Sequence, residues 1–494
     1  MLGEKTTVAG WFILIGMPIY LFAAVYSTGY FHPDEHYQII EFANFKLGKT
    51  PYNDLAWEYG EQIRPSFQVW LVYLFFKFMG LFNIEDPYMI TSVLRMVTGV
   101  FALAVTYLFV ITSMKRISVP FRKVYVCISL LLWFVPFLSV RFSSENISGL
   151  FFVSSIALFQ YERATKSLKY VFIGILQGLA FICRFQCLVM SAGFFIWLLF
   201  VHRAGVRQLL FLITGGVSVL LLGIILDLWF YGETVFTFYN YFNTNILQDV
   251  ASDFGTRPWY FYLQEIALQP FFLIGSLILL SLAGIFLKDR KNLLLYCTVP
   301  FLIVHSIIPH KELRFIFPLI PFVPIVITKL FEITWSIPVI NKFLADKRYL
   351  WLGPAIVLII INLLLLTCVS VRSAGNSSKQ ITEFIHNNYY GKPVILYTQM
   401  GTNPYTPYLG LKEDFYIEKN IRFKYLDEME GDSTGRGGKN IILLCLQPDE
   451  LPKEIRKSNS IYQLELISIP EWMNKGELFF FNRKQKAYIL YRKR

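Results

Sequence analysis

Residues 10–38 read GWFILIGMPIYLFAAVYSTGYFHPDEHYQ, an apolar run that leads directly into a cluster of ionisable side chains. The run over 10–28 is long enough to cross a bilayer, which takes about 18 to 20 apolar residues. The cluster holds two adjacent carboxylates and two imidazoles, from Asp34, Glu35, His32 and His36. Pro33 favours an extended conformation at the residue before it, so a helix in the cluster begins no earlier than the proline. The stretch predicts a membrane protein that presents this polar cluster where its first span ends.

The whole chain has the composition of a polytopic membrane protein. Of its 494 residues, 55% are hydrophobic and 16% are charged, whereas soluble domains have roughly 25% charged residues. A lone Lys5 precedes the first apolar run and no small-residue cleavage site follows it, so we interpret this run as a retained span. The apolar runs predict about eleven transmembrane helices, near 10–28, 92–113, 124–140, 147–160, 170–182, 187–201, 208–230, 264–286, 292–308, 315–333 and 350–370.

The net charge and the cysteines exclude two classes of function. The formal charge is +12, but the basic residues form short clusters between apolar runs, which is typical of cytoplasmic loops and not of a nucleic-acid surface. The six cysteines include no CxxC pair and no metal-ligand spacing. We therefore expect no nucleic-acid partner, no metal and no cofactor.

The basic loops indicate the orientation of the spans. By the positive-inside rule, all of them belong on the cytoplasmic side. One alternating topology satisfies them if residues 66–82, which carry Lys77, do not cross the membrane, since a lysine inside lipid is costly. We expect 66–82 to lie along the outer membrane face or to be re-entrant, with Met1 inside and the C-terminus outside. The basic loops are 115–123, 163–169, 203–207, 288–291 and 342–348.

This topology collects the unusual polar residues on one external face. It makes 29–91 a large first external loop with a membrane-surface helix, and it also exposes 231–263 and 309–314. Ionisable residues near a membrane are functional candidates by default. The polar residues that would line this face are His32, Asp34, Glu35, His36, Glu58, Arg64, Arg141, Glu145, Asn240, Asn243, Asp253, His310, Lys311, Glu312 and Arg314.

The tail over 371–494 differs from residues 1–370, which we take as the transmembrane catalytic domain. Short apolar runs bounded by Gly, Pro, Asp and Lys predict strands, and 378–388 predicts a helix. The tail is therefore expected to be a small external α/β domain that supports the site or recognises substrate. The expected strands are 393–397, 441–446, 461–467, 478–481 and 487–491.

Three groups of residues suit particular chemistry. In the first, a carboxylate of Asp34 or Glu35, partly desolvated at the membrane surface, would have a raised pKa and act as a better base, although both could simply be solvated.

The second group is the segment His310-Lys311-Glu312-Leu313-Arg314, which lies between two apolar runs. Three cationic or near-cationic groups at a membrane edge suit a phosphate or pyrophosphate headgroup. The alternative is a set of snorkelling interface anchors, but Lys and Arg are depleted on the external side.

The third group combines aromatic, asparagine and glycine residues, including Asn240, Asn243 and Trp259. It suits sugar recognition by stacking and amide hydrogen bonds, with an aromatic belt at the bilayer interface as the alternative.

Four segments also resemble, in matching order, the motifs of the glycosyltransferase family 22 mannosyltransferases. They are HPDEHYQ at 32–38, DLWFYG at 227–232, FGTRPWYFY at 254–262 and HKELRF at 310–315, and the resemblance covers roughly residues 10–335. It is greatest for the branch that adds the third mannose of glycosylphosphatidylinositol. The resemblance implies a GT-C fold and a lipid-linked donor, dolichyl- or polyprenyl-phosphate mannose.

The resemblance also implies site roles. An acceptor hydroxyl, deprotonated by a carboxylate, would attack the anomeric carbon with inversion and form an α-1,2 linkage on a glycolipid or lipid-linked glycan. Asp34 is then the expected base, with Glu35 orienting or sharing the role. The donor phosphate would be held by His310, Lys311 and Arg314, with Arg64 and Arg141 as further candidates. The expected sugar and acceptor contacts are His32, His36, Gln38, Asn240, Asn243 and Trp259.

Two other functions stay open at this point. A related transferase would move a different lipid-linked sugar onto a surface glycan or lipid. A lipid-linked sugar transporter would place polar residues at mid-membrane depth on both sides of a pseudo-symmetric core, and no such repeat is found. The composition favours a bacterial inner membrane with a periplasmic site, whereas a eukaryotic chain would sit in the endoplasmic reticulum with a lumenal site.

Overall fold

The structure is a computed structural model that describes residues 2–161, 167–372, 374, 377–428, 440–447, 461–468 and 487–493. Its contacts divide the chain into two compact units. The helical unit comprises Met1–Val25, Glu58–Trp70 and Val93–Val371. The loop-sheet unit comprises Tyr26–Trp57, Leu71–Ser92 and Arg372–Arg494. The described residues of 372–494 therefore share one compact unit with two parts of the predicted first external loop.

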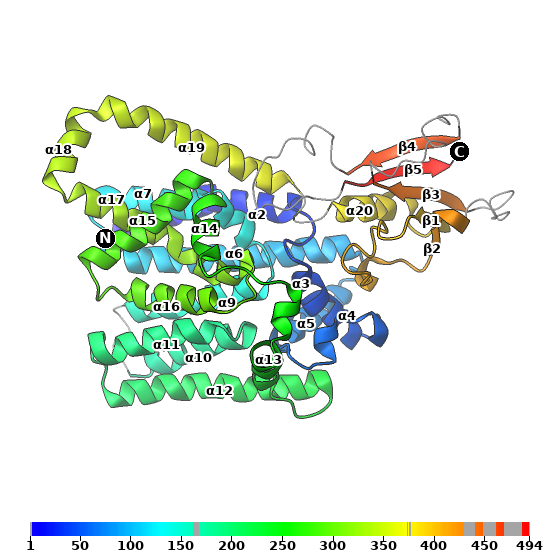
Figure 1. Cartoon of the computed structure of the whole chain (residues 1–494), viewed down its shortest axis with the longest axis horizontal. Coiled ribbons are helices and arrows are strands. Elements are labelled where there is room, and N and C mark those ends of the chain that lie inside the picture. The colour runs from blue at the N-terminus through cyan, green and yellow to red at the C-terminus, as the bar shows by residue number, and fades with distance from the viewer. Residues whose placement is uncertain are drawn as a thin grey trace. The chain divides into compact units, whose positions relative to one another are not determined.

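Helices make up the chain up to residue 371, and several lie side by side along most of their length (Figure 1). Here α marks α-helices and η marks 3-10 or π turns. The first half contains α1 (Leu2–Trp11), η1 (Phe12–Gly16), α2 (Met17–Tyr26), α3 (Pro33–Glu35), η2 (His36–Ile40), α4 (Glu41–Lys46), η3 (Tyr52–Asp54), η4 (Trp57–Tyr59), α5 (Phe67–Leu81), α6 (Pro87–Ser113), η5 (Met114–Arg116), η6 (Val119–Phe121), α7 (Arg122–Leu131), α8 (Phe134–Ser139), α9 (Ser144–Gln160) and α10 (Lys169–Cys183). The second half contains α11 (Cys187–Trp197), η7 (Leu198–His202), α12 (Val206–Tyr231), α13 (Thr237–Phe242), η8 (Asn243–Leu247), η9 (Val250–Phe254), α14 (Phe261–Leu268), α15 (Phe272–Lys288), α16 (Leu293–Ile307), η10 (Leu313–Phe322), α17 (Val323–Trp335), α18 (Pro338–Asp346) and α19 (Arg348–Val371).

Each of the eleven apolar runs coincides with one helix or with consecutive helical segments. Among the described residues, five helices are long and apolar enough to cross a membrane, namely Thr7–Tyr26, Pro87–Arg116, Val206–Tyr231, Leu313–Trp335 and Leu352–Val371. Shorter apolar helices lie at Phe67–Leu81, Lys169–Cys183, Cys187–His202, Phe272–Lys288 and Leu293–Ile307. The chain is therefore a polytopic helical membrane protein.

Two of the expected spans are interrupted. The run over 124–140 breaks between α7 and α8, where Asn362 of α19 accepts a hydrogen bond from the Trp133 backbone N–H at 3.0 Å and donates one to the Leu131 carbonyl at 2.7 Å. The amide thus satisfies backbone groups that the break exposes, as lipid-embedded structure requires. The run over 264–286 breaks at Pro270, because proline cannot continue the ladder of helical hydrogen bonds.

Close backbone approach joins α10 to α12. A side chain at Gly174 would place its Cβ 2.0 Å from the Leu212 carbonyl oxygen, so only glycine permits this contact. Small residues at helix contacts are typical of membrane bundles, where helices gain stability from close packing.

Two of the basic loops each contact another helix within the helical unit. Lys329 of α17 donates to the Arg116 carbonyl, and the Trp197 indole of α11 donates to the Lys291 carbonyl at 2.7 Å. His310 likewise contacts the Gly255 carbonyl at 2.8 Å, which joins two motif-bearing segments.

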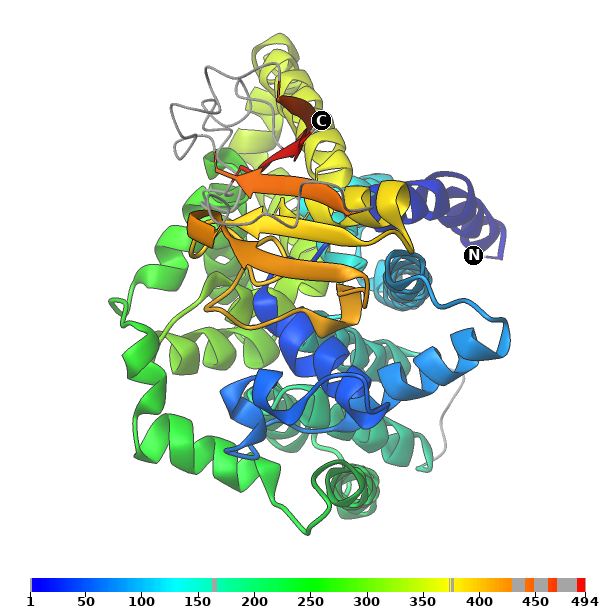
Figure 2. The ribbon, with the colours of Figure 1, turned by 90° about the vertical axis from the view of Figure 1, so that its right-hand side faces the viewer.

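The loop-sheet unit contains a five-stranded sheet in the order β2-β1-β3-β5-β4. Strand β1 pairs in parallel with β2 and β3, whereas β5 pairs antiparallel with β3 and β4. Figure 2 shows the strands from yellow β1 to red β5. The strands are β1 (Val394–Thr398), β2 (Ile421–Tyr425), β3 (Ile441–Leu446), β4 (Tyr462–Ile467) and β5 (Ile489–Lys493).

Helix α20 (Ser378–Tyr389) covers one face of this sheet. Its buried Ile381 and Ile385 pack with Leu396 of β1 and Leu443 of β3. The helix and four of the strands coincide with predicted elements, and the strand expected at 478–481 lies outside the described residues. Strand β2 was not predicted, because its sequence IRFKY alternates with charged residues and lacks a continuous apolar run.

Candidate active site

The HPDEH segment begins a helix in the loop-sheet unit. His32 is the N-cap residue, with its backbone extended at φ −130° and ψ 143°, and Pro33 occupies the first helical position. The His32 imidazole Nδ1 accepts the Asp34 backbone N–H at 3.2 Å. Residues 33–46 then continue as α3, η2 and α4. The sequence encodes this start, because proline is favoured at the first helical position and lacks only an N–H that would be unpaired there.

The two adjacent carboxylates have different surroundings. Glu35 Oε1 accepts the backbone N–H groups of Phe31 and His32, both at 3.1 Å, and so closes a capping box. The Asp34 side chain is 18% exposed, and its Oδ1 lies 3.2 Å from His32 Nδ1. Glu35 therefore stabilises the start of the helix, whereas the Asp34 carboxylate is partly exposed and lies beside the His32 imidazole.

His36 and Gln38 point into the interior of the same unit. His36 is 2% exposed, and its Nε2 lies 2.9 Å from the buried carboxylate of Glu41. Burial lowers the pKa of His36, so the imidazole is neutral at neutral pH. Gln38 is buried as well. In this conformation neither side chain presents a surface to a sugar, and their predicted contact with substrate stays a prediction.

The basic motif forms a chain of charged groups in the helical unit. His310 Nε2 lies 3.5 Å from Glu312 Oε1, and Glu312 Oε2 accepts from Arg314 Nε. Arg314 Nη1 in turn donates to Glu145 Oε1 at 3.0 Å. The hydrogen bond to Glu312 raises the pKa of His310. A protonated His310 would therefore add positive charge to this row of charged groups, at the end away from the buried Glu145.

Lys311 has a structural role in this conformation. Its ammonium group donates to the carbonyls of Arg257 at 2.9 Å, Ile308 and Pro309. Burial lowers its pKa. The three carbonyls use all three N–H donors of a lysine ammonium. Lys311 thus holds the motif loop against the segment that carries the FGTRPWYFY motif.

Sequence reasoning did not single out Arg184, which extends the charged chain. Its Nη1 donates to Glu145 Oε1 at 2.8 Å, so one carboxylate oxygen holds two guanidinium groups. Both guanidinium groups lie over the ring of Phe315, with centroid distances of 4.9 and 5.2 Å. The available signal was a single arginine at the junction of two short apolar runs, on the side predicted to be external.

The remaining arginine candidates lie in the same unit. Arg141 is buried, and its guanidinium carbon lies 4.8 Å from the Phe137 ring centroid. Arg64 Nη2 lies 3.4 Å from Glu58 Oε1. Each is thus held by its surroundings, and nothing in these contacts assigns either of them to a phosphate.

The aromatic and asparagine candidates are closer to the surface. Trp259 is 68% exposed, and Asn240 Nδ2 donates to the Gln62 carbonyl at 3.3 Å. Asn243 begins the turn η8 and is half-buried. The exposed indole is free to lie at a membrane interface or against a sugar.

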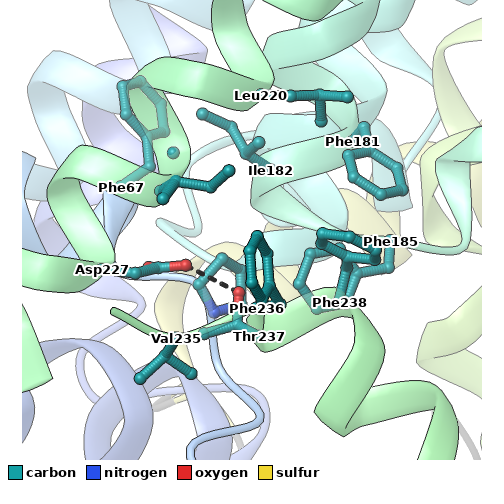
Figure 3. A pocket seen from close by; sticks show the side chains of 13 residues that line it. Phe67, Phe181, Ile182, Phe185, Leu220, Asp227, Val235, Phe236, Thr237 and Phe238 are labelled. Atoms are coloured by element: carbon teal, nitrogen blue, oxygen red, sulfur yellow. Dashed lines mark hydrogen bonds between the residues drawn. The ribbon is translucent and has the colours of Figure 1, made fainter. Parts of the chain in front are cut away.

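A small pocket lies beside Asp227 of the DLWFYG motif (Figure 3). Its walls are almost entirely apolar, and Asp227 is already satisfied by the Ser66 backbone N–H and hydroxyl at 2.9 and 2.7 Å and by the Thr237 hydroxyl at 2.7 Å. This carboxylate therefore ties two loops together. The lining residues are Pro65, Phe67, Phe181, Ile182, Phe185, Leu220, Gly223, Ile224, Asp227, Val235, Phe236, Thr237 and Phe238.

The structure gathers the candidates into two sets. His32, Asp34, Glu35, His36 and Gln38 belong to the loop-sheet unit, and the candidates from Arg64 to Arg314 belong to the helical unit. Within the described part of the chain, no group of three or more His, Cys, Asp or Glu residues could hold a metal ion.

Comparison with known structures identifies the fold. ArnT from Cupriavidus metallidurans, crystallised with undecaprenyl phosphate, aligns over 98% of both chains with a TM-score of 0.51 and 13% sequence identity. The same protein in its apo state aligns with the same TM-score. Together with the apolar helices, this likeness defines an integral membrane protein with the GT-C fold of glycosyltransferases.

The family model narrows the class. The chain belongs to the Alg9-like mannosyltransferase family, whose model matches residues 11–404. GPI alpha-1,2-mannosyltransferase 3 of Bos taurus is 29% identical over 302 residues, which are 59% of this chain and 53% of that protein. GPI mannosyltransferase 3 of Candida albicans is 26% identical over 297 residues, 59% of this chain and 58% of that protein. The match thus spans somewhat more than half the length of these relatives.

Proposed function

We propose that this protein is an inverting mannosyltransferase that moves mannose from dolichyl- or polyprenyl-phosphate mannose to a glycolipid or lipid-linked glycan, with an α-1,2 linkage. Family membership and the names of the relatives support the sugar and the linkage. The observation that carries the mechanism is the contrast between neighbours: Glu35 accepts two backbone N–H groups in a capping box, whereas the Asp34 carboxylate is partly exposed beside the His32 imidazole.

In the proposed reaction, Asp34 takes the proton of an acceptor hydroxyl. The acceptor oxygen forms a bond to the anomeric carbon of mannose from the face opposite the phosphate. The bond between that carbon and the phosphate oxygen breaks, so the β-linked donor gives an α-linked product. The lipid phosphate leaves with the bonding electron pair.

The developing phosphate charge needs cationic partners, since preorganised charge is effective in a site that excludes water. We assign this role to Arg314 and His310, because the charged chain holds both side chains in fixed positions. Lys311 contributes by shaping the loop. Arg64 and Arg141 stay weaker candidates for holding the donor phosphate, because only their position on the predicted external face favours them.

The proposed location follows from the charge pattern. The motif loops face the side opposite the basic loops, which is the periplasm for a bacterial inner membrane protein and the lumen for an endoplasmic reticulum protein. About eleven spans and an external C-terminal part complete this topology.

Transfer assays with purified protein test the proposal. The protein would be incubated with a glycolipid acceptor and a panel of polyprenyl phosphates that carry mannose, glucose or another sugar, and products would be identified by mass spectrometry. We expect transfer from the mannose donor. Transfer only from another donor would establish the alternative sugar, and movement of donor lipid across vesicles without a covalent product would establish a transporter.

A further inference from the structure

One segment of the C-terminal part contacts the helix that carries Asp34. Residues 411–416, here called the strap, follow β1 and precede β2 in the loop-sheet unit. The Leu411 carbonyl accepts the Tyr37 hydroxyl at 3.1 Å, and Glu413 Oε1 accepts the Tyr30 hydroxyl at 2.9 Å. The Phe415 backbone N–H donates to Glu41 Oε1 at 3.0 Å. The strap therefore makes three hydrogen bonds to residues 30–41.

Glu41 is the centre of these contacts. Its side chain is 1% exposed and accepts from three segments: His36 Nε2 at 2.9 Å, the Thr50 hydroxyl at 2.6 Å and the Phe415 N–H. Asn44 in turn donates to the Thr50 hydroxyl at 2.9 Å, which leaves the Thr50 proton directed to Glu41. Burying a carboxylate is costly unless it is well hydrogen-bonded, so this network specifies one arrangement of the three segments.

The imidazole of His36 is fixed by the same network. It stacks between the rings of Tyr30 and Tyr416, with centroid distances of 5.7 and 5.3 Å. Because Glu41 only accepts hydrogen bonds here, the neutral imidazole carries its proton on Nε2. His36 is thus clamped between an aromatic ring of the strap and one of the first loop.

A second buried carboxylate strengthens the strap. Glu413 pairs with Lys379 of α20, and both side chains are almost fully buried. The Lys379 ammonium also lies 4.2 Å from the centroid of the Tyr416 ring. The pair connects the sheet-covering helix, the strap and Tyr30, so movement of the strap would disturb all three.

Asp34 is close to this network along the helix. Glu41 follows Asp34 by seven residues of continuous helical structure, or roughly 10 Å of rise. His36 follows by two residues. A shift in these anchors is therefore transmitted to the turn that carries the carboxylate.

We propose that Glu41 is a positioning residue for Asp34 and that the strap of the C-terminal part holds it in place. This inference rests on the proposed role of Asp34 as the base. It gives the C-terminal part a defined task, which is to set the geometry of the catalytic helix through Glu41 and Glu413.

The test compares three variants in the full-length protein. Glu41→Gln removes the charge, and the double variant Tyr30→Phe/Tyr37→Phe removes two strap hydrogen bonds while it keeps both rings. Tyr125→Phe is the matched control, since Tyr125 is also buried and bonds to Ser113 at 2.8 Å, but in the helical unit. Each variant is assayed for kcat and donor KM and for hydrogen exchange of peptides that cover residues 30–46.

For Glu41→Gln and the double variant we expect kcat to fall by about 10- to 100-fold, the loss that small misplacement of a catalytic group produces. Donor KM should stay within about twofold of the wild type, because the substituted residues are not proposed to contact the bound donor. Hydrogen exchange at 30–46 should accelerate. Tyr125→Phe should leave kcat, donor KM and hydrogen exchange at 30–46 unchanged.

Unchanged kcat in both test variants would overturn the inference, as would a loss of kcat without faster exchange at 30–46. If Glu41→Gln does not fold, the double tyrosine variant decides alone. If the wild type transfers no mannose, the proposed function is contradicted. If Glu41→Gln still accelerates hydrogen exchange at 30–46 in that case, the structural role of Glu41 in holding this helix remains supported. The two failures are therefore distinguishable.

Discussion

The carboxylate of Glu35 accepts a hydrogen bond from the backbone N–H of His32 at 3.1 Å. This contact separates the two acids of the HPDEH segment, which the sequence presents as equivalent neighbours. A capping carboxylate near a helix start is stabilising because unpaired N–H groups and the helix dipole both favour negative charge there.

The first prediction concerns these two acids. Asp34→Asn should lower kcat by about 10²- to 10⁴-fold, the usual contribution of a general base. Glu35→Gln should retain most activity, because glutamine also completes a capping box. Mannose transfer at saturating donor measures both effects. Equal losses in the two variants would contradict the assignment, and full activity in both and in the double variant would exclude either acid as the base.

The second prediction concerns the buried cluster around Glu145. Its side chain is 4% exposed and holds Arg184 and Arg314, so Glu145→Ala removes the carboxylate that pairs with buried Arg184 and one of the two carboxylates that pair with Arg314. Breaking a buried pair in this way costs about 3–5 kcal/mol. Chemical unfolding in detergent measures the change in stability. The control is Glu233→Gln, at an exposed residue that bonds to Gln62, where we expect a change of about 0.5 kcal/mol or less.

The third prediction concerns phosphate binding. Arg314→Lys removes the planar guanidinium that bonds both Glu312 and Glu145. A lysine ammonium is a compact point charge and does not reproduce the fixed donor geometry that reaches both carboxylates. If Arg314 holds the donor phosphate, the Kd of polyprenyl phosphate should rise by about tenfold, or about 1.4 kcal/mol. Equilibrium binding in nanodiscs measures it. The matched control is Arg122→Lys, whose Nε bonds to the Ile117 carbonyl in a basic loop, and equal effects in the two variants would disprove the specific role.

The fourth prediction is a pH dependence of stability. Burial and the neighbouring carboxylates of Glu41 and Asp54 raise the pKa of Asp414 to about 6. The folded state therefore binds this proton more tightly than the unfolded state, whose Asp pKa is about 3.9. It follows that the contribution of Asp414 to stability falls as pH rises from about 4 to 6 and stays low above that range.

Asp414→Asn should remove this loss of stability at high pH. The Tm at pH 8, relative to the Tm at pH 5, should therefore be higher in the variant than in the wild type. Thermal unfolding of the full chain at several pH values measures it. Asp427→Asn, at an exposed aspartate of the same unit, is the control and should leave the pH profile unchanged. An unaltered profile for Asp414→Asn would contradict the prediction.

The fifth prediction concerns the membrane topology. Lys77→Cys and Lys115→Cys would be made singly in a background without the six native cysteines. Both positions are exposed on the molecule. A membrane-impermeant maleimide added to intact cells should label position 77 and not position 115, and permeabilised cells should label both. Labelling of position 115 in intact cells would show that loop 115–123 is external. The predicted orientation would then be wrong, and the motif loops would not all lie on the external side.

Local hydrophobicity was enough to predict the helices, since each apolar run is helical. A lipid-facing backbone has few alternatives, because every N–H and C=O must be paired internally. The interruption between α7 and α8 could not be predicted in this way. It depends on Asn362, which is more than 200 residues away and supplies both hydrogen bonds.

The candidate site was predictable in composition and not in roles. The polar motifs stand out in an apolar sequence, and HPDEH and HKELR were found for that reason. Which groups face outward depends on their partners. Lys311 bonds to three carbonyls, and His36 is sandwiched between Tyr30 and Tyr416. Arg184 and Glu41 attracted no notice because a lone charge has no local signature.

The sequence by itself determined that this is a multispanning membrane protein with acidic and basic motifs of a mannosyltransferase family, because hydrophobic run length and short motifs are local properties of the chain. Only the tertiary structure decided which of two adjacent acids caps a helix, which arginines share Glu145, and that residues 411–416 hold the helix of Asp34. Those decisions depend on hydrogen bonds between segments far apart in the chain. A buried charge is tolerated only where folding brings its partners to it.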